Sequence, residues 1–370
     1  MIKQLDLKAV TQMHSDEYLQ AASRVINSGW YLHGEETRRF EADYARYTGT
    51  EHCVAVANGL DALRLIIRAY KELGIFHDGD EIIVSAHTFI ATIIAITDNG
   101  LTPVLIDPTL DNLEMDIDQV ESHITPRTKG IMIVHLYGRM AYTDHLGDIC
   151  SRHSLILMED CAQAQGCTYH DIKAGALGQA GAHSFYPGKN IGAMGDAGAV
   201  TTSDGVLADT IRTLANYGSH VKYECEYAGI NSRMSEMDAA ILDIKLRYLD
   251  ADNAQRQRLA DFYYDHISNP LIALPLRLSH ENNVYHQFPV LCARRDELQQ
   301  HLLENGVQTL IHYPIPPHKQ RCYTTAPWNT PQLSLPITEL IHNQELSLPM
   351  NQVVTESEAQ TIVDAINSFR

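Results

Sequence analysis

One lysine, Lys189, stands in the glycine-rich stretch SFYPGKNIGAMGDAGA (residues 184–199), and none of the five residues before it is acidic. An ammonium group in a flexible, nearly uncharged loop either binds a phosphate or serves as a nucleophile through its free amine. The stretch is not a Walker A loop, because the pattern G-x-x-x-x-G-K-[ST] is absent. Ser184 opens the stretch with a hydroxyl, and an ordinary surface position is the alternative for Lys189.

A pair of carboxylates follows the apolar run SLILMED (154–160), which is typical of a buried strand that leads into Glu159 and Asp160. A carboxylate at the end of a buried strand is costly unless a cation lies close to it. The pair therefore either faces a bound cation, such as a protonated heterocycle, or caps a following helix. Gln163, three residues on, can add a hydrogen bond from the same turn.

Two further strand ends carry groups of interest. VANGLDAL places Asn58 and Gly59 where a strand ends and a helix begins, which is either an anion site of free N–H groups or an ordinary turn. Phe89 ends the run DEIIVSAHTF and either covers a planar ring or joins the core. An anion site, an aromatic ring, an aspartate, a serine and a lysine are together the parts of a pyridoxal 5'-phosphate (PLP) site. In such a site the lysine forms a Schiff base and the carboxylate keeps the pyridine nitrogen protonated.

The elements that must position these groups alternate along the first part of the chain. Apolar runs typical of buried strands occur at 52–59, 80–89, 102–108, 130–138 and 154–160, with two closing strands at 182–186 and 197–203. Helical patterns lie between them, including 116–124 and 143–153, so we expect an α/β fold with a mostly parallel sheet covered on both faces. Ligands bind at the carboxyl ends of such strands. The glycines at 175–181 do not form G-x-G-x-x-G, which disfavours a dinucleotide-binding oxidoreductase.

The pattern changes in the last third of the chain. Residues 235–265 read as a long helix, followed by a strand over 283–292, a helix over 295–306, a strand interrupted by prolines over 307–318, and a last helix over 357–370. These elements predict a large domain over 1–250 and a smaller α+β domain over 251–370.

Composition excludes several classes of function. The 370-residue chain has a formal net charge of −18, which argues against nucleic acid or an anionic membrane as a partner. No run reaches the roughly 18 apolar residues of a membrane span, and the N-terminus lacks the apolar segment of a signal peptide. Seven cysteines without a C-x-x-C pair favour reduced thiols in the cytoplasm. No histidine or cysteine spacing predicts a metal site.

Several stretches, GDEIIVSAHTFIATIIAI, MEDCAQAQG, SFYPGKNIGAMGDAGAV and GINSRMSEMDAAIL, resemble the nucleotide-sugar aminotransferases of the DegT/DnrJ/EryC1/StrS group in family order. The resemblance covers nearly the whole chain. It implies the fold type I (aspartate aminotransferase-like) architecture, with PLP as cofactor and a homodimer whose active sites lie at the subunit interface.

The resemblance also implies residue roles. Lys189 matches the lysine that binds the cofactor covalently, and Asp160 matches the partner of the pyridine nitrogen. The other cofactor contacts that it implies are Gln163 beside the ring, Phe89 stacked on it, Ser184 with the backbone of Gly59 and Leu60 around the phosphate, and Asn231 from the other subunit. Family members often have Ser or Thr where this chain has Leu60, so the phosphate would depend more on backbone N–H groups.

Finer features indicate a subgroup. Many members that aminate C4 carry GEGG after the lysine, whereas this chain has GDAG (195–198) and is most similar to the branch that aminates C3 of dTDP-3-keto-6-deoxyhexoses. In that branch, the residues that line the sugar site match Tyr186, Lys222, His312 and Tyr313. Members with histidine in place of the lysine are dehydratases, and this chain keeps the lysine.

The resemblance thus predicts a PLP-dependent sugar transaminase that makes a dTDP-3-amino-3,6-dideoxyhexose, galacto or gluco, for deoxyamino sugar biosynthesis such as that of lipopolysaccharide O-antigen. L-glutamate is the expected donor and leaves as 2-oxoglutarate. The alternatives are a C4 aminotransferase acting on a dTDP- or UDP-4-keto-6-deoxy sugar and a non-catalytic PLP- or sugar-binding regulatory protein.

Overall fold

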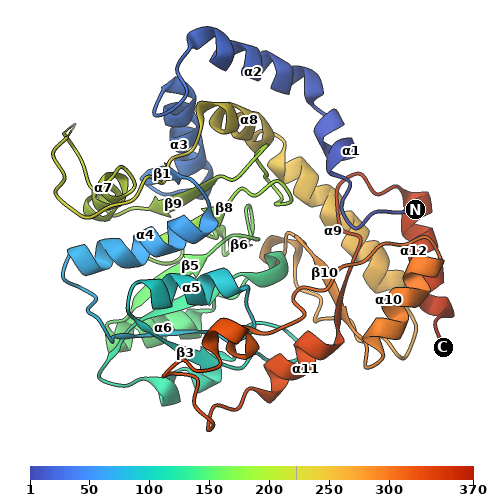
Figure 1. Ribbon diagram of the computed structural model, residues 1–370. Coiled ribbons are helices and arrows are strands. Elements are labelled where there is room, and N and C mark those ends of the chain that lie inside the picture. The colour runs from blue at the N-terminus through green and yellow to red at the C-terminus, as the bar shows by residue number, and fades with distance from the viewer. Residues whose placement is uncertain (222) are drawn as a thin grey trace.

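The computed structural model describes residues 1–221 and 223–370, and its framework is a seven-stranded sheet (Figure 1). The strand order is β1-β9-β8-β5-β4-β2-β3. The strands are β1 His52–Val56, β2 Glu81–Ser85, β3 Thr102–Ile106, β4 Thr128–Val134, β5 Ile156–Asp160, β8 Ala180–Ser184 and β9 Gly198–Thr202. A separate two-stranded ribbon consists of β6 Thr168–Tyr169 and β7 Ile172–Lys173.

The sheet is mostly parallel, as the sequence predicts. Only β9 runs against its neighbours, since it pairs antiparallel with both β1 and β8. The other neighbouring strands pair in parallel. Six strands therefore point in one direction, and their carboxyl ends meet at one edge of the sheet.

Helices cover both faces of the sheet. One face is covered by α4 (Gly59–Glu72), α5 (Ile90–Asp98) and α7 (Gly205–Leu214), and the other by α3 (Glu35–Thr48), α6 (Asp144–His153) and α8 (Glu236–Leu246). Strand residues alternate between the two layers. Ile82 and Val84 pack into the cluster under α4, whereas Ile83 between them packs under α6.

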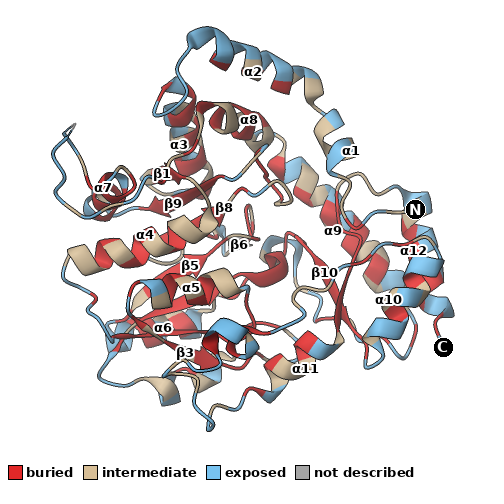
Figure 2. Cartoon of the chain, viewed as in Figure 1, coloured by how far each residue is buried: buried red, intermediate tan, exposed pale blue. Residues whose placement is uncertain are grey.

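Burial follows this layered arrangement. Figure 2 shows that the central strands are mostly buried. In contrast, α2 (Ser15–Ser28), which follows the short helix α1 (Leu7–Gln12), is exposed along much of its length. Only Tyr18, Ala21 and Val25 of α2 are buried. Across the two described ranges, every helix is too short or too polar to traverse a bilayer.

The C-terminal part builds a second core. It contains α9 (Leu249–His266), β10 (Phe288–Leu291), α10 (Arg295–Glu304), β11 (Glu345–Leu348) and α12 (Glu356–Ser368). Strands β10 and β11 pair antiparallel. In contrast, α11 (Pro336–Gln344) packs Ile341 into the first core. Because α9 crosses residue 250, the division into domains 1–250 and 251–370 stays a prediction.

The predicted strand over 307–318 is wrong. The described residues of this segment form only isolated bridges, Val307 with Ile2 and Leu310 with Ser347. Prolines at positions 314, 316 and 317 cannot donate a backbone hydrogen bond, so a ladder cannot extend through them.

Two predicted helical segments also differ in detail. Residues 235–265 form two helices, α8 and α9, which are separated by a short break. Residues 116–124 form only two 3-10 turns, Ile117–Gln119 and Glu121–His123.

Candidate active site

Asp160 lies at the carboxyl end of β5 and is buried. Its Oδ2 accepts a hydrogen bond of 2.8 Å from the Thr92 hydroxyl, and its Oδ1 accepts one of 3.1 Å from the N–H of Ala162. Burial raises the pKa of the Asp160 carboxyl, while these two hydrogen bonds and the charge of Lys189 act in the opposite direction. A buried carboxylate with this environment is suited to a cationic partner.

Lys189 follows β8 in a loop and is partly buried. Its N–H donates to the carbonyl of Tyr186 at 2.8 Å, which closes a turn around the side chain. Burial lowers the pKa of the Lys189 amine to about 8, and the charge of Asp160 acts against that shift. The amine is therefore much closer to its reactive, unprotonated form at neutral pH than an ordinary lysine is.

Gly59 and Ser184 bring two strand ends into direct contact. Gly59 is the first residue of α4, and a Cβ atom added to it would lie 2.6 Å from the Cβ atom of Ser184. Asn58 caps the helix by accepting from the N–H of Asp61 at 2.8 Å. Within the described residues, the N–H groups of Gly59 and Leu60 have no acceptor. Free N–H groups at the start of a long helix beside a hydroxyl fit a phosphate.

Phe89 precedes α5 at the same edge, and 48% of its surface is exposed. Its ring lies 4.9 Å from the ring of Tyr313, centroid to centroid. The Tyr313 hydroxyl accepts a hydrogen bond of 3.1 Å from Nε2 of Gln163. The N–H of Tyr137 donates to Oε1 of Gln163 at 2.6 Å, so the amide has a fixed orientation. These contacts bring together three predicted site residues from distant parts of the chain.

His312 lies beside Tyr313 and is held by the second core. Its N–H donates to Glu345 at 2.6 Å, and its Nδ1 lies 2.9 Å from the Ser347 hydroxyl. Burial lowers the pKa of His312 to about 4, and the charge of Lys189 adds to the effect. The imidazole is therefore neutral at physiological pH and lies within electrostatic range of Lys189.

The remaining predicted residues lie nearer the surface. Tyr186 is 57% exposed. Asn231 is exposed, and its backbone forms an isolated bridge with Asn216. Lys222 lies outside the described residues.

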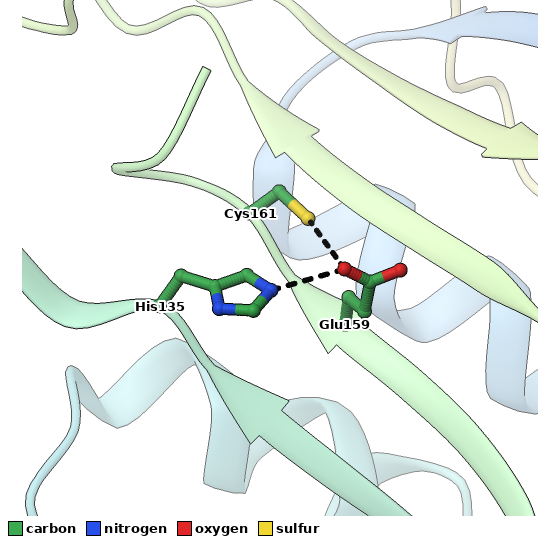
Figure 3. A group of neighbouring side chains, drawn as sticks. All are labelled: His135, Glu159 and Cys161. Carbon is green, nitrogen blue, oxygen red and sulfur yellow. Dashed lines mark hydrogen bonds and ion pairs between the residues drawn. The ribbon is translucent and has the colours of Figure 1, made fainter. Parts of the chain in front are cut away.

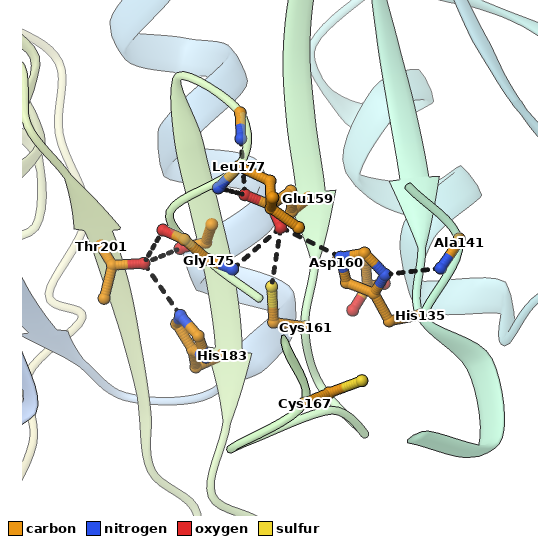
Figure 4. Close-up of polar contacts among 12 residues, drawn as sticks. His135, Ala141, Glu159, Asp160, Cys161, Cys167, Gly175, Leu177, His183 and Thr201 are labelled. Atoms are coloured by element: carbon orange, nitrogen blue, oxygen red, sulfur yellow. Dashed lines mark hydrogen bonds and ion pairs between the residues drawn. The ribbon is translucent and has the colours of Figure 1, made fainter. Parts of the chain in front are cut away.

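Glu159, the neighbour of Asp160, belongs to a different network. Its carboxylate accepts hydrogen bonds from the N–H groups of Gly175, Leu177 and Gly178 at 2.8–2.9 Å (Figure 4). The glycine-rich segment 175–181 is therefore anchored by a buried carboxylate. This network satisfies Glu159 without a ligand, whereas the helix cap considered for the pair is absent from the described residues 161–167.

His135, Glu159 and Cys161 lie close enough together to resemble metal ligands (Figure 3). Nδ1 of His135 accepts from the N–H of Ala141 at 3.1 Å, so Nε2 carries the hydrogen of the neutral ring and donates to Glu159 at 3.0 Å. A metal would have to displace that hydrogen and compete with three N–H donors. The geometry fits a hydrogen-bonded cluster better than a metal site.

Thr92, His87 and Tyr137 contribute to the site but are missing from the sequence prediction. Thr92 lies one helical turn after Phe89, and this spacing at a strand end is a signal that could have indicated it. His87 and Tyr137 contact residues from other parts of the chain, and the sequence carries no local signal of those contacts.

The fold and the site define a fold type I PLP-dependent aminotransferase. The arrangement fits the cofactor because free N–H groups lie beside Ser184, an exposed Phe89 lies at the same sheet edge, and the buried Asp160 interacts with a lysine of lowered pKa. The chain belongs to the DegT/DnrJ/EryC1/StrS aminotransferase family, which matches residues 12–367.

Individual relatives match along almost their whole length. The chain is 47% identical over 369 residues to the dTDP-3-amino-3,6-dideoxy-α-D-galactopyranose transaminase of Aneurinibacillus thermoaerophilus, covering 100% of this chain and 99% of the relative. It is 44% identical over 367 residues to the dTDP-3-amino-3,4,6-trideoxy-α-D-glucose transaminase of Streptomyces venezuelae, covering 99% and 95%. A crystal structure of S. venezuelae DesV in complex with a ketimine intermediate superposes with a TM-score of 0.94 at 43% identity, covering 99% and 97%.

Proposed function

We propose that the protein transfers an amino group to C3 of a dTDP-linked 3-keto-6-deoxyhexose and so forms a dTDP-3-amino-3,6-dideoxyhexose. The observation that carries the proposal is the placement of Lys189 and Asp160: Lys189 follows β8, Asp160 ends the parallel neighbouring strand β5, and the two charges interact. The names of the two relatives, each with a dTDP-3-amino sugar, support the substrate class.

Each of the cofactor-facing residues has its own role in the proposed reaction. When bound, PLP supplies an electron sink that makes a proton on the carbon next to the amino nitrogen acidic. Asp160 keeps a proton on the ring nitrogen, Gln163 and Phe89 orient the ring, and Ser184 binds the phosphate together with the N–H groups of Gly59 and Leu60. Thr92 orients the Asp160 carboxylate through its hydrogen bond of 2.8 Å.

Lys189 moves the proton. Its unprotonated amine takes a proton from the α-carbon of the amino donor and returns one to C3 of the sugar. Over the two half-reactions the amino group passes from the donor to C3 of the sugar. One water supplies the oxo oxygen of the resulting 2-oxo acid, and the keto oxygen of the sugar leaves as another water. With L-glutamate as donor, the second product is 2-oxoglutarate. Tyr186, His312, Tyr313 and Lys222 line the sugar site in this proposal.

We also propose that the protein is a homodimer in the cytoplasm. Trp30 and Tyr31 are 63% and 56% exposed, and large exposed apolar side chains fit a subunit interface. Asn231, which is exposed, reaches the phosphate of the partner subunit in this arrangement. All seven cysteines are free, which fits a reducing compartment.

Product analysis tests the proposal directly. The purified protein, loaded with PLP, is incubated with ¹⁵N-labelled L-glutamate and either dTDP-3-keto-6-deoxygalactose or a dTDP-4-keto-6-deoxy sugar. The proposal predicts ¹⁵N bonded to C3, detected by NMR, and none at C4. Labelling at C4 would instead support the C4 aminotransferase, and no transfer to any keto sugar would favour the regulatory alternative.

A further inference from the structure

The backbone of the segment that carries His312 and Tyr313 is held by a hydrogen-bonded group of three buried side chains. None of the three takes part in the proposed reaction. The Tyr137 hydroxyl donates to the carbonyl of His312 at 2.5 Å, and Nδ1 of His342 donates to the carbonyl of Tyr313 at 2.6 Å. His87 connects the two donors, with Nδ1 at 3.1 Å from Nε2 of His342 and Nε2 at 3.1 Å from the Tyr137 hydroxyl. We call Tyr137, His87 and His342 the carbonyl clamp.

The clamp residues come from three separate places in the fold. His87 lies in the loop after β2, two residues before Phe89, and Tyr137 follows β4. His342 lies on α11. All three are buried, at 1%, 0% and 1% exposure for His87, Tyr137 and His342. A buried donor–acceptor chain of this kind fixes the backbone that it holds, because each broken link would leave a buried polar group unpaired.

Counting hydrogens fixes the roles within the clamp. A carbonyl can only accept, so His342 must carry its hydrogen on Nδ1, and its Nε2 must accept from Nδ1 of His87. The four contacts then share three hydrogens while both rings are neutral. Burial keeps them neutral, because it lowers the pKa of His342 to about 4 and holds the pKa of His87 well below its usual value. The Tyr137 hydroxyl lies nearer to the His312 carbonyl, at 2.5 Å, than to Nε2 of His87, at 3.1 Å, so its hydrogen goes to the carbonyl and the contact between His87 and Tyr137 has none. Tyr137 and His342 therefore hold the carbonyls directly, and His87 acts by supporting His342.

The clamp is linked to the cofactor-facing residues as well. The backbone of Tyr137 orients Gln163, whose amide donates to the Tyr313 hydroxyl, and the Tyr313 ring contacts Phe89. Over residues 309–315, all of which are described, the one strand-like pairing is the isolated bridge between Leu310 and Ser347. Its position against the cofactor thus depends on side-chain contacts.

We propose that Tyr137 and His342, supported by His87, are positioning residues that set His312 and Tyr313 for binding of the nucleotide sugar. This inference rests on the proposed function, since it takes these two residues to line the sugar site. The clamp acts on sugar affinity through the held backbone and touches neither sugar nor cofactor.

The test compares matched tyrosine-to-phenylalanine variants. Tyr137→Phe removes the hydroxyl that holds the His312 carbonyl. Tyr263→Phe is the control, because the Tyr263 hydroxyl is equally buried and donates to the backbone carbonyl of Pro349 at 2.8 Å in the second core. The probe is dTDP-3-amino-3,6-dideoxygalactose, whose Kd is measured by calorimetry for the enzyme loaded with pyridoxamine phosphate, a form with which an amino sugar cannot exchange its amino group. Hydrogen–deuterium exchange of the peptide over 309–315 is a second readout that needs no substrate.

Tyr137→Phe should weaken binding of the probe about tenfold, the factor for one buried hydrogen bond, and speed exchange of the 309–315 peptide. Tyr263→Phe should lower the melting temperature as much as Tyr137→Phe does, but it should change neither the Kd of the probe nor the exchange of the 309–315 peptide. A second pair covers the case in which Tyr137→Phe does not fold. His342→Leu removes the donor to the Tyr313 carbonyl and should weaken binding, whereas His342→Asn retains an amide donor at the Nδ1 position and should restore it.

His312→Ala distinguishes a failure of the clamp's positioning role from a failure of the sugar-site role of His312. Weak binding by His312→Ala, together with wild-type binding and exchange in both clamp variants, would overturn the clamp and leave the sugar site standing. Wild-type binding by His312→Ala would overturn the sugar-site role itself, and the role of the clamp in sugar binding would fall with it.

Discussion

Replacing Gly59 with alanine tests whether the contact between α4 and β8 forms the phosphate site. The added Cβ atom would lie 2.6 Å from the Cβ of Ser184 and 3.2 Å from its Cα and Oγ. Carbon atoms in ordinary contact lie roughly 3.5–4.0 Å apart, so α4 and β8 must separate by about 1 Å. The φ angle of Gly59 lies outside the left-handed region, and the effect is therefore steric.

The loss of PLP affinity in Gly59→Ala depends on whether the free or the PLP-bound protein carries the strain. The apoprotein relieves the overlap by shifting the start of α4, but bound phosphate needs the N–H groups of Gly59 and Leu60 and the hydroxyl of Ser184 to converge. Binding must reverse the shift, and overpacking of this kind costs about 1–3 kcal/mol. The Kd for PLP should therefore rise about 5- to 150-fold.

The assay is a titration of the apoprotein with PLP, followed by quenching of intrinsic fluorescence. Gly195→Ala is the control, because a Cβ atom at Gly195, in the loop between β8 and β9 that also carries Lys189, has no neighbour within 4 Å. Adding Gly59→Ala to Ser184→Gly should also weaken PLP binding less, relative to Ser184→Gly alone, than adding it to the wild type does, because Ser184→Gly removes the Cβ atom with which the added methyl group would overlap. The reasoning is refuted if Gly59→Ala binds PLP as tightly as Gly195→Ala does.

Three further predictions concern the strand-end residues. Asp160→Asn should lower turnover about a hundredfold or more while PLP stays bound, as judged by steady-state rates and visible absorption; near-normal turnover would contradict the proposed role. Because burial lowers the pKa of Lys189 to about 8, the rate of PLP capture by the apoprotein should rise with pH through about 8 and then level off. In Asp160→Asn that midpoint should move to lower pH, since the carboxylate raises the pKa of Lys189, and an upward shift would disprove the coupling. Glu159→Gln should lower the free energy of unfolding in urea by about 2–4 kcal/mol, and a chelator should leave wild-type stability unchanged; a chelator-sensitive melting curve would point to a bound metal.

The sequence makes the strand-end chemistry predictable because apolar runs that alternate with helices force a parallel sheet. Once the sheet is parallel, groups that follow different strands must gather at one edge, and Asp160, Ser184 and Lys189 do so. The antiparallel insertion of β9 between β1 and β8 does not disturb that edge. Local pattern and topology therefore suffice for the cofactor-facing residues.

Other parts of the site depend on contacts that no local pattern encodes. Glu159 and Asp160 look equivalent in the sequence, yet alternation along β5 sends one to the loop at Gly175 and the other toward Lys189. The segment over 307–318 is apolar enough to suggest a strand, but its prolines leave it to be held by side chains. The partners of that segment, such as His342, become visible only in three dimensions.

The central claim is that Lys189 is the residue that reacts with the cofactor. The PLP-loaded protein is reduced with borohydride, digested, and mapped by mass spectrometry for the lysine that carries the pyridoxyl phosphate group. Lys245 is the internal competitor, because burial lowers its pKa to about 8 as well while its amine donates to the carbonyl of Gly192 at 2.6 Å. The account predicts modification at Lys189 with Lys245 unmodified, and it is contradicted if the group is found on any other lysine or on none.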